Sequence, residues 1–328
     1  MTSPFPPTPP ASMSRVRSAS PVRRGVPKSL PIGALAGIAW VIALAPSATA
    51  QRTEKREEPK LRKVPIETRD GIKLNAFYWP TVGGKDSPVA LILHEWEGQS
   101  SPYGPLVQQL HAADIAVLAL DYRGHGGSDK EVVAPGGRTT KLNPSQMSRR
   151  DVEAVVAMDI ESAKGFLRDE NNDENVNLNA LAVIGVGQGA ILGAHFAARD
   201  WAFPSRGRVK QGQDVKAMVL VSPDRQLKGV PLDAPMRDPN LIQLPVMVVY
   251  GTESSEASEA RRLASKLNAV KKKLGRGTVS NLETLEVPTS LSDAPLVTSA
   301  GPVIPAVVKF IQESVPVGDG QNEWVERR

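Results

Sequence analysis

The chain contains no cysteine among its 328 residues. This absence excludes a disulfide-stabilised scaffold, a zinc site built on thiolates and a cysteine nucleophile. Acidic residues are absent from the first 50 positions, which hold five of the 40 basic residues. The remaining 35 basic residues equal the 35 acidic ones, so residues 51–328 are formally neutral. A basic face is therefore not expected, and the composition predicts no nucleic-acid partner.

Long apolar runs are scarce, and the run near the start of the chain is short. Residues 30–45 form it, after a stretch that carries arginine and no acid, and its length suits the core of a signal peptide. A membrane-spanning helix needs about 20 apolar residues. Residues 48–50 read Ala-Thr-Ala, the small-x-small pattern that signal peptidase recognises. We predict a signal peptide over 1–50, cleaved before Gln51, and export to the periplasm or the extracellular space; an uncleaved membrane anchor is the alternative.

The part of the chain after the leader divides into a charged lead-in, one domain and a tail. Residues 51–62 are expected to be mobile, residues 63–316 form the domain, and residues 317–328 are a C-terminal tail. Within the domain, apolar strand patterns alternate with amphipathic helical patterns. The expected strands are residues 64–68, 72–78, 89–93, 115–120, 180–186, 217–221, 245–250 and 282–287. The expected helices are residues 106–113, 151–167, 188–199, 256–267 and 303–313.

Buried strands that alternate with helices are typical of a mostly parallel sheet covered by helices on both faces. The expected fold class is therefore α/β, with residues 69–71 (Arg-Asp-Gly) as a hairpin turn before the parallel part. The connection between the strands at 217–221 and 245–250 is short, so no large lid is expected. Ligands of such sheets bind at the carboxyl ends of the strands.

Polar and glycine-rich motifs follow these strand ends in order. They read His-Glu-Trp-Glu-Gly at 94–98, Asp-Tyr-Arg-Gly-His-Gly-Gly-Ser at 121–128, Gly-Val-Gly-Gln-Gly at 185–189, Ser-Pro at 222–223 and Gly-Thr-Glu-Ser at 251–254. In this order and spacing the set resembles the α/β-hydrolase superfamily, and its His-Glu-x-x-Gly opening is most similar to the dienelactone-hydrolase branch. The resemblance covers residues 64–315. It implies an α/β-hydrolase fold and an ancestral activity on esters or other acyl compounds.

The position that this family uses for its nucleophile holds glycine here. In the family, a serine or cysteine stands at the centre of a sharp Gly-x-Ser-x-Gly turn. The centre in this chain is Gly187, which has no side chain to attack a carbonyl. The resemblance places the general-base histidine after the last strand, whereas the four histidines of the chain end at His195. The acid falls on Ser254, with Glu253 and Glu256 nearby, so the sequence predicts a degenerate triad without catalytic residues.

The same resemblance leaves a residual pocket of the oxyanion-hole type around Gly187. The backbone amides of Trp96 and Gln188 are its expected hydrogen-bond donors. Glu95 corresponds to the glutamate that contacts the nucleophile in the dienelactone-hydrolase branch, and here it is expected to face a small void. His94 precedes it at the same strand end.

Two other sets of polar residues are given structural interpretations. Two histidines and three carboxylates lie near the ends of the strands at 89–93 and 115–120: His94, Glu95, Glu97, Asp121 and His125. Their spacing does not match a known metal-ligand motif, so we expect neither a metal nor a cofactor. Residues 271–273 (Lys-Lys-Lys) are expected to be a solvated helix end stabilised by the helix dipole.

We interpret the chain as an exported α/β-hydrolase-fold protein that has lost its catalytic groups and serves as a binding or scaffold protein. Its expected partner is a small acyl or carbohydrate-type ligand or another envelope protein, and a membrane only if the leader is retained. One alternative is an active ester or acyl hydrolase that uses a relocated group, such as Glu95 activating a water. The other is a structural envelope protein without a ligand.

Overall fold

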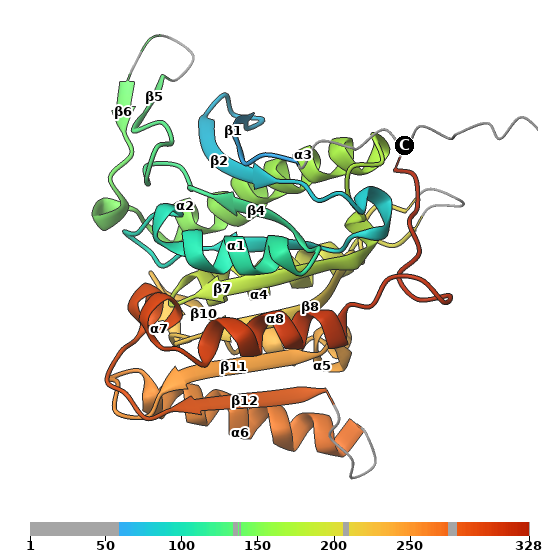
Figure 1. Cartoon of the computed structure of the whole chain (residues 1–328). Helices are drawn as coiled ribbons and strands as arrows, with labels where there is room; N and C mark the ends of the chain where they lie inside the picture. The colour runs from blue at the N-terminus through green and yellow to red at the C-terminus, as the bar shows by residue number, and fades with distance from the viewer. Residues whose placement is uncertain (1–58, 134–136, 138, 206–209, 275–280, 328) are drawn as a thin grey trace, which may run out of the picture. The chain divides into compact units, whose positions relative to one another are not determined.

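The computed structural model describes residues 59–327, apart from residues 134–136, 138, 206–209 and 275–280. The predicted signal peptide and most of the predicted lead-in lie outside the described residues. Eight strands form the central sheet: β1 (Arg62–Glu67), β2 (Lys73–Trp79), β3 (Val89–Leu93), β4 (Ala116–Leu120), β7 (Leu181–Val186), β8 (Val215–Val221), β11 (Val246–Gly251) and β12 (Leu282–Val287). Their spatial order is β1-β2-β4-β3-β7-β8-β11-β12 (Figure 1).

The pairing of the strands confirms the predicted hairpin and the predicted parallel sheet. β1 pairs with β2 and β2 with β4 in antiparallel fashion, and the strands from β4 to β12 are parallel to one another. The turn between β1 and β2 contains Gly71 at φ +80°, a conformation that glycine adopts without strain. The carboxyl ends of β3, β4, β7, β8, β11 and β12 therefore meet at one edge of the sheet.

Helices cover both faces of this sheet. On one face lie α1 (Gly104–Ala112), α7 (Asp293–Ser299) and α8 (Val303–Ser314), and on the other lie α3 (Glu161–Asn172), α4 (Gly189–Trp201) and α6 (Ala257–Leu274) (Figure 1). Because successive side chains of a strand point to opposite faces, Val89, Leu91 and Leu93 of β3 join one core while Ala90 and Ile92 join the other. The α/β fold class is thereby confirmed.

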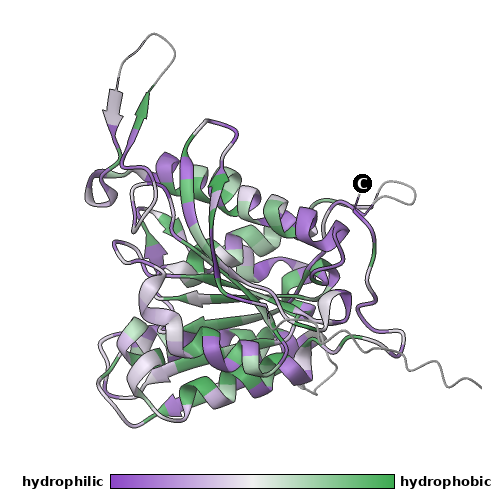
Figure 2. Ribbon diagram, turned by 45° about the horizontal axis from the view of Figure 1, so that its top comes forward, coloured by the Kyte–Doolittle hydropathy of each residue, from purple (hydrophilic) through white to green (hydrophobic). Residues whose placement is uncertain are grey.

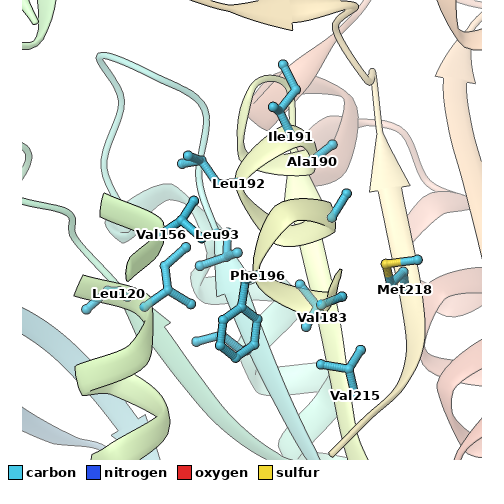
Figure 3. Close-up of a cluster of buried hydrophobic side chains, with 14 of the residues drawn as sticks. Leu93, Leu120, Val156, Val183, Ala190, Ile191, Leu192, Phe196, Val215 and Met218 are labelled. Atoms are coloured by element: carbon cyan, nitrogen blue, oxygen red, sulfur yellow. The ribbon is translucent and has the colours of Figure 1, made fainter. Parts of the chain in front are cut away.

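The hydropathy of the ribbon follows this layering. Figure 2 shows hydrophobic colour along the central strands and hydrophilic colour on the loops and the outer sides of the helices. In Figure 3, Phe196 of α4 lies among Leu93, Leu120 and Val183 of the sheet, and all four side chains are fully or almost fully buried. Burial of one such side chain is worth about 2 kcal/mol, so this face of α4 holds the helix firmly against the sheet.

Several short elements were not predicted from the sequence. β5 (Glu131–Val133) and β6 (Thr139–Lys141) form a hairpin that projects from the rest of the fold within the loop 121–148 (Figure 1). Between β8 and β11 lie β9 (Gln226–Leu227), β10 (Val230–Pro231), η6 (Pro235–Arg237) and α5 (Pro239–Gln243). The remaining turns are η1 (Gly84–Asp86), η2 (Ser101–Tyr103), η3 (Pro144–Gln146) and η5 (Leu178–Ala180). The β8–β11 connection is compact, as expected for a fold without a large lid.

No single helix among the described residues is both long enough and apolar enough to cross a membrane. Within the part of the chain that the structure describes, one pair of helices, α7 and α8, reaches the required length and composition when taken together, and the two are bent by 90° at their junction.

The end of α6 differs from its prediction. Lys271 is 3% exposed, and its Nζ donates hydrogen bonds to the carbonyl oxygens of Ile242 (2.7 Å) and Leu244 (2.6 Å). The prediction of a solvated lysine cluster is therefore wrong for Lys271, while Lys272 and Lys273 are exposed as expected. Lys271 satisfies carbonyl groups that the short helix α5 leaves unpaired at its end.

The predicted helix at 151–167 contains a wide turn with a structural role. α2 (Arg149–Ala154), η4 (Val155–Ile160) and α3 run without a break, and η4 is π-helical. η4 carries the fully buried Asp159, which accepts hydrogen bonds from the backbone N (2.8 Å) and the Nε (2.8 Å) of Arg123. Arg123 also contacts Asp70 in the β1–β2 turn at 2.7 Å. Arg123 thus ties the loop after β4 both to the β1–β2 hairpin, through Asp70, and to η4, through Asp159.

Replacement of this buried carboxylate tests its role. Asp159→Asn leaves the Arg123 guanidinium without its fully buried counter-charge, and we expect the free energy of unfolding to fall by about 3 kcal/mol in urea denaturation. The control is Arg149→Met, which removes the exposed Arg149–Glu153 pair and is expected to cost at most about 0.5 kcal/mol. Equal losses for the two variants would contradict this assignment.

Candidate active site

The turn between β7 and α4 keeps the backbone of a hydrolase nucleophile turn, with Gly187 at its centre. Gly187 has φ +54°, its N donates to the carbonyl of Val221 (2.9 Å), and its carbonyl accepts from the N of Ala190 (3.1 Å). A Cβ atom on Gly185 would lie 2.5 Å from the Cα of Ala190, and one on Gly189 would overlap carbonyl oxygens at the end of β3. The flanking glycines are thus required by close packing, and only the central side chain of the turn is missing.

The space beside Gly187 is filled by the carboxyl group of Asp293. A Cβ atom on Gly187 would lie only 2.6 Å from Asp293 Oδ1 and 3.1 Å from the Cβ of Glu95. Asp293 follows β12 and begins α7, which is the region where the resemblance placed the general-base histidine. Its backbone has φ +49°, and its N donates a hydrogen bond to the Oγ of Ser222 (3.0 Å). A carboxyl group therefore occupies space that a nucleophile side chain would need.

Sequence reasoning did not single out Asp293. The sequence did contain a feature that could have pointed to it: an acidic residue in the loop after the last strand, where the resemblance placed the general-base histidine. Its approach to Gly187 joins segments 106 positions apart in the sequence, and no local pattern reports such a contact.

The charge of Asp293 depends on pH in the neutral range. Burial raises its pKa to about 7, and the negative charges of Glu256, Asp224 and Glu95 add to the increase. Asp293 Oδ1 has no hydrogen-bond partner within the described part of the chain. The pKa of Asp224 is also raised, by burial first and then by Glu256. Beside Gly187 therefore lie the side chains of Asp293 and Glu95, and the charges of Asp224 and Glu256 act on Asp293.

One of the two predicted oxyanion-hole donors, the backbone amide of Trp96, already has a hydrogen-bond partner within the protein. The backbone N of Trp96 donates to the side-chain Oε1 of Gln188 (3.0 Å), so this amide is already satisfied. The Gln188 Nε2 in turn donates to the carboxylate of Asp224, which holds the amide group in that orientation. An incoming carbonyl oxygen would have to displace Gln188 before it could bind Trp96 N.

Glu95 is held by a tyrosine rather than aimed at a void. The hydroxyl of Tyr103 donates a short hydrogen bond to Glu95 Oε2. Burial and the charge of Glu95 raise the pKa of Tyr103 well above its usual value, so the phenol remains a donor. A Cβ atom on Gly98 would lie 2.7 Å from the carboxyl carbon of Glu95, which shows that the side chain is closely packed. The void expected beside Glu95 is instead filled in part by Asp293.

The serine at the predicted acid position is hydrogen-bonded within its own turn, and the two nearby glutamates differ in their surroundings. Ser254 Oγ donates to the carbonyl of Gly251 (2.9 Å) within its own turn. Glu253 is exposed, and its backbone N bonds to Thr289. Glu256 lies two residues after Ser254, and its negative charge contributes to the raised pKa values of Asp293 and Asp224. Of the two nearby acids that the sequence offered, Glu256 is thus the one whose charge acts on Asp293.

His94 and His125 lie next to each other, with His94 directly before Glu95 in the sequence. Each Nδ1 contacts a backbone carbonyl, that of Glu95 (2.7 Å) and that of Arg123 (2.8 Å), and each Nε2 has no hydrogen-bond partner in the described structure. Burial lowers the pKa of His94 to about 4 and also lowers that of His125, so both rings are neutral at neutral pH. Their ring centres are 5.4 Å apart. Among the described residues, no group of three or more histidine, aspartate or glutamate side chains is arranged to hold a metal ion.

The other two histidines have structural partners. His195 Nε2 contacts the carbonyl of Pro231 (2.9 Å), and His111 Nε2 contacts the carbonyl of Pro80 (3.0 Å) and stacks on Trp79. Neither ring faces Asp293 or Gly187.

A cavity of about 660 Å³ opens beside the carboxyl cluster. Its polar lining includes Glu95, Glu97, Gln99, His125, Lys130 and Ser145. Glu97 is held at φ +66°, a conformation that non-glycine residues rarely adopt and that is typical of functional sites. The cavity therefore presents hydrogen-bond donors and acceptors at the strand ends where α/β folds bind their ligands.

The strand order, the turn at Gly187 and the positions of these loops define an α/β-hydrolase-fold protein. A sequence model of the family described as "Serine aminopeptidase, S33" matches residues 85–237, slightly less than half of the chain. The esterase Pf2001 of Pyrococcus furiosus is 16% identical and has a TM-score of 0.56, covering 78% of this chain and 92% of its own. The protein Est1E of Butyrivibrio proteoclasticus is 18% identical with a TM-score of 0.52, covering 77% of this chain and 99% of its own. These likenesses confirm the fold; the dienelactone-hydrolase branch stays a prediction.

Curated relatives match shorter parts of the chain than these two solved structures do. The protein Rv2307c of Mycobacterium tuberculosis is 35% identical over 83 residues, which are 25% of this chain and 30% of that protein. The protein YnbC of Escherichia coli is 30% identical over 169 residues, which are 51% of this chain and 24% of that protein. The chain thus spans less than a third of the length of either relative.

The ionisation of Asp293 predicts a measurable pH dependence of stability. Its folded-state pKa of about 7 lies above its ordinary value of 3.8, so wild-type stability falls as the pH rises from about 4 to about 7. Asp293→Asn removes this loss. We expect its melting temperature to exceed that of the wild type by a few degrees above pH 7, with the difference shrinking below pH 5.

The matched control is Asp173→Asn, the same change at an exposed aspartate. If Asp293→Asn differs from the wild type by the same amount at pH 5 and pH 8, Asp293 does not titrate as described.

Proposed function

We propose that this chain is a non-catalytic α/β-hydrolase-fold protein that acts by binding a ligand. The observation that carries the proposal is the pairing of Gly187 with Asp293. Acyl transfer by this fold requires a nucleophile and a base that takes its proton. At Gly187 there is no nucleophile, and a carboxyl group stands where the imidazole would be.

The closed oxyanion pocket supports the same proposal. The Trp96 amide is satisfied by Gln188, and the Gln188 side chain is anchored on Asp224. Loss of one oxyanion donor from a working enzyme costs about 100- to 1000-fold in turnover. This chain has therefore lost transition-state stabilisation in addition to the reacting groups.

The cavity beside Glu95 supports a small, hydroxyl-rich ligand of carbohydrate type. Lys130 donates hydrogen bonds only, while Gln99 and Ser145 both donate and accept. Such a mixed lining suits hydroxyl groups, which donate and accept at once. Together with the predicted export, this makes a carbohydrate-binding envelope protein the function that we propose, with an acyl ligand or a protein partner as the alternatives.

Rebuilding the catalytic pair tests the non-catalytic proposal. Gly187→Ser combined with Asp293→His restores a hydroxyl and an imidazole in the matching positions and removes the carboxyl that a side chain at 187 would meet. We expect this double variant to react with a fluorophosphonate probe at least about 100-fold faster than the wild type, because a positioned base contributes that much. Covalent labelling is followed by intact-protein mass spectrometry.

Two controls accompany the double variant. Gly187→Ala with Asp293→His has the same geometry without the hydroxyl, and Gly187→Ser alone lacks the base; neither is expected to be labelled. Rapid stoichiometric labelling of the wild type would contradict the proposal, because it would reveal another activated nucleophile.

Ligand class is tested by thermal shift. A panel of mono- and disaccharides, short-chain carboxylic acids and esters is added to the wild type, and a true ligand at ten times its Kd is expected to raise the melting temperature by about 3–6 °C. The shift should disappear in Lys130→Met, which lines the cavity, and persist in Lys273→Met, which is exposed on α6. Stabilisation only by the acids or esters would replace the carbohydrate by an acyl ligand.

One observation favours a second candidate, a hydrolase that uses carboxyl groups. Asp293 has a pKa of about 7 and lies beside Glu95 and the space over Gly187. A carboxylate with a pKa near the working pH is suited to remove a proton from water. This candidate requires turnover that follows the ionisation of Asp293.

A further inference from the structure

A second cavity, of about 850 Å³, lies far from Gly187 near the start of β8. β1, η4, α3, the end of α4 and residues 210–214 form its walls. Four acidic and six basic side chains line this cavity. The basic ones are Arg69, Lys164, Arg168, Arg199, Lys210 and Arg327. Because the parallel strands begin here and end at Gly187, the two cavities occupy opposite edges of the sheet.

The deep end of this cavity holds an excess of positive charge around one carboxylate. Asp214 is 1% exposed and contacts Lys164 (3.0 Å), Lys210 (3.1 Å) and the guanidinium of Arg327. Lys164 also pairs with Asp200. Three cations thus share two carboxylates. Burial lowers the pKa of Lys210 to about 8, and the positive charges of Lys216 and Arg327 contribute to the decrease.

Hydrogen bonds to the backbone of the C-terminal tail position Arg327 at the deep end of this cavity. Asn171 Nδ2 donates to the carbonyl of Val325 (3.0 Å), and Asn172 exchanges two hydrogen bonds with the backbone N (2.8 Å) and carbonyl (2.6 Å) of Arg327. Trp324 Nε1 donates to the carbonyl of Asn171 (2.9 Å). Residues 324–327, predicted only as a tail, are therefore docked along the end of α3.

The Arg327 side chain has binding capacity that the protein does not use. The residue is 3% exposed and lines the cavity, and its Nε has no hydrogen-bond partner in the described residues. A buried donor without a partner costs about 1–3 kcal/mol, a cost that a ligand acceptor removes. Guanidinium groups bind phosphate and carboxylate oxygens with particular strength.

We propose that this cavity is a binding site for an oxyanion group, phosphate or carboxylate, of a small molecule, with Arg327 and Lys210 as its inner contacts. Arg69 at the rim adds positive charge toward solvent, whereas Arg168 and Arg199 are paired with Asp169 and Glu161. Because Arg327 belongs to the docked tail, ligand and tail stabilise each other. The proposal does not depend on the proposed function, which concerns the other edge of the sheet.

Thermal melting of the full chain tests the site with inorganic phosphate as the probe. We expect a saturable rise of the wild-type melting temperature of about 3–6 °C over sodium chloride of equal ionic strength, once phosphate exceeds its Kd about tenfold. Succinate is the second arm: a larger shift with succinate than with phosphate assigns the site to carboxylates. Lys210→Met is expected to abolish the shift. Lys272→Met, the same change on the exposed side of α6, is expected to retain it.

Two further measurements keep the test decisive if Lys210→Met does not fold. Arg69→Met changes an exposed rim residue and is expected to weaken phosphate binding severalfold. Carboxypeptidase B removes basic residues from C-termini, and phosphate at ten times its Kd is expected to slow removal of Arg327 about tenfold. Equal phosphate shifts in all variants, or trimming of Arg327 at the same rate with and without phosphate, would overturn the proposal.

Discussion

The contact between Asp293 and Gly187 is the interaction on which the character of this molecule depends. Glycine at the centre of the β7–α4 turn leaves open a volume that a nucleophile side chain would fill, and the carboxyl group from the loop after β12 enters it. A Cβ atom at 187 would lie 2.6 Å from Asp293 Oδ1, so a side chain at this position would require the Asp293 carboxyl group to move.

The surroundings keep the shape of an active site although they lack its reacting groups. Ser222, Glu97 and Asp293 have φ of +45°, +66° and +49°, conformations that cost about 1–3 kcal/mol each for non-glycine residues. The fold still holds this strain, and it still packs the flanking glycines of the turn tightly. What has changed is the charge: carboxyl groups from four loops converge where a hydrolase gathers a hydroxyl and an imidazole.

The sequence predicted the sheet well because its signals are local. Continuous apolar runs such as residues 89–93 and 181–186 mark strands buried on both faces, and the Asp-Gly of the first turn marks the hairpin. The same reasoning located Gly187 and the strand ends. The π-helical turn that carries Asp159 was missed because the apolar spacing of the helix continues through it.

The features that escaped prediction depend on contacts between distant segments. Asp293 approaches Gly187 across the sheet, Gln188 closes the Trp96 amide, and Lys271 turns inward to the carbonyl groups of α5. Composition and periodicity describe a residue's own element, and they do not specify which side chain of another loop will meet it. Arg327 illustrates this limit, since a charged residue near the end of a chain gives no sign that it is buried against Asp214.

The most direct measurement is steady-state hydrolysis of an activated ester, such as p-nitrophenyl butyrate, by the wild-type chain between pH 5 and pH 9. A chain whose nucleophile position is glycine and whose base position is a carboxyl group should give no saturable turnover above the buffer rate at any pH. Saturable turnover above about 1 s⁻¹ that rises through pH 7 and is lost in Asp293→Asn would contradict this account and establish a carboxyl-based hydrolase.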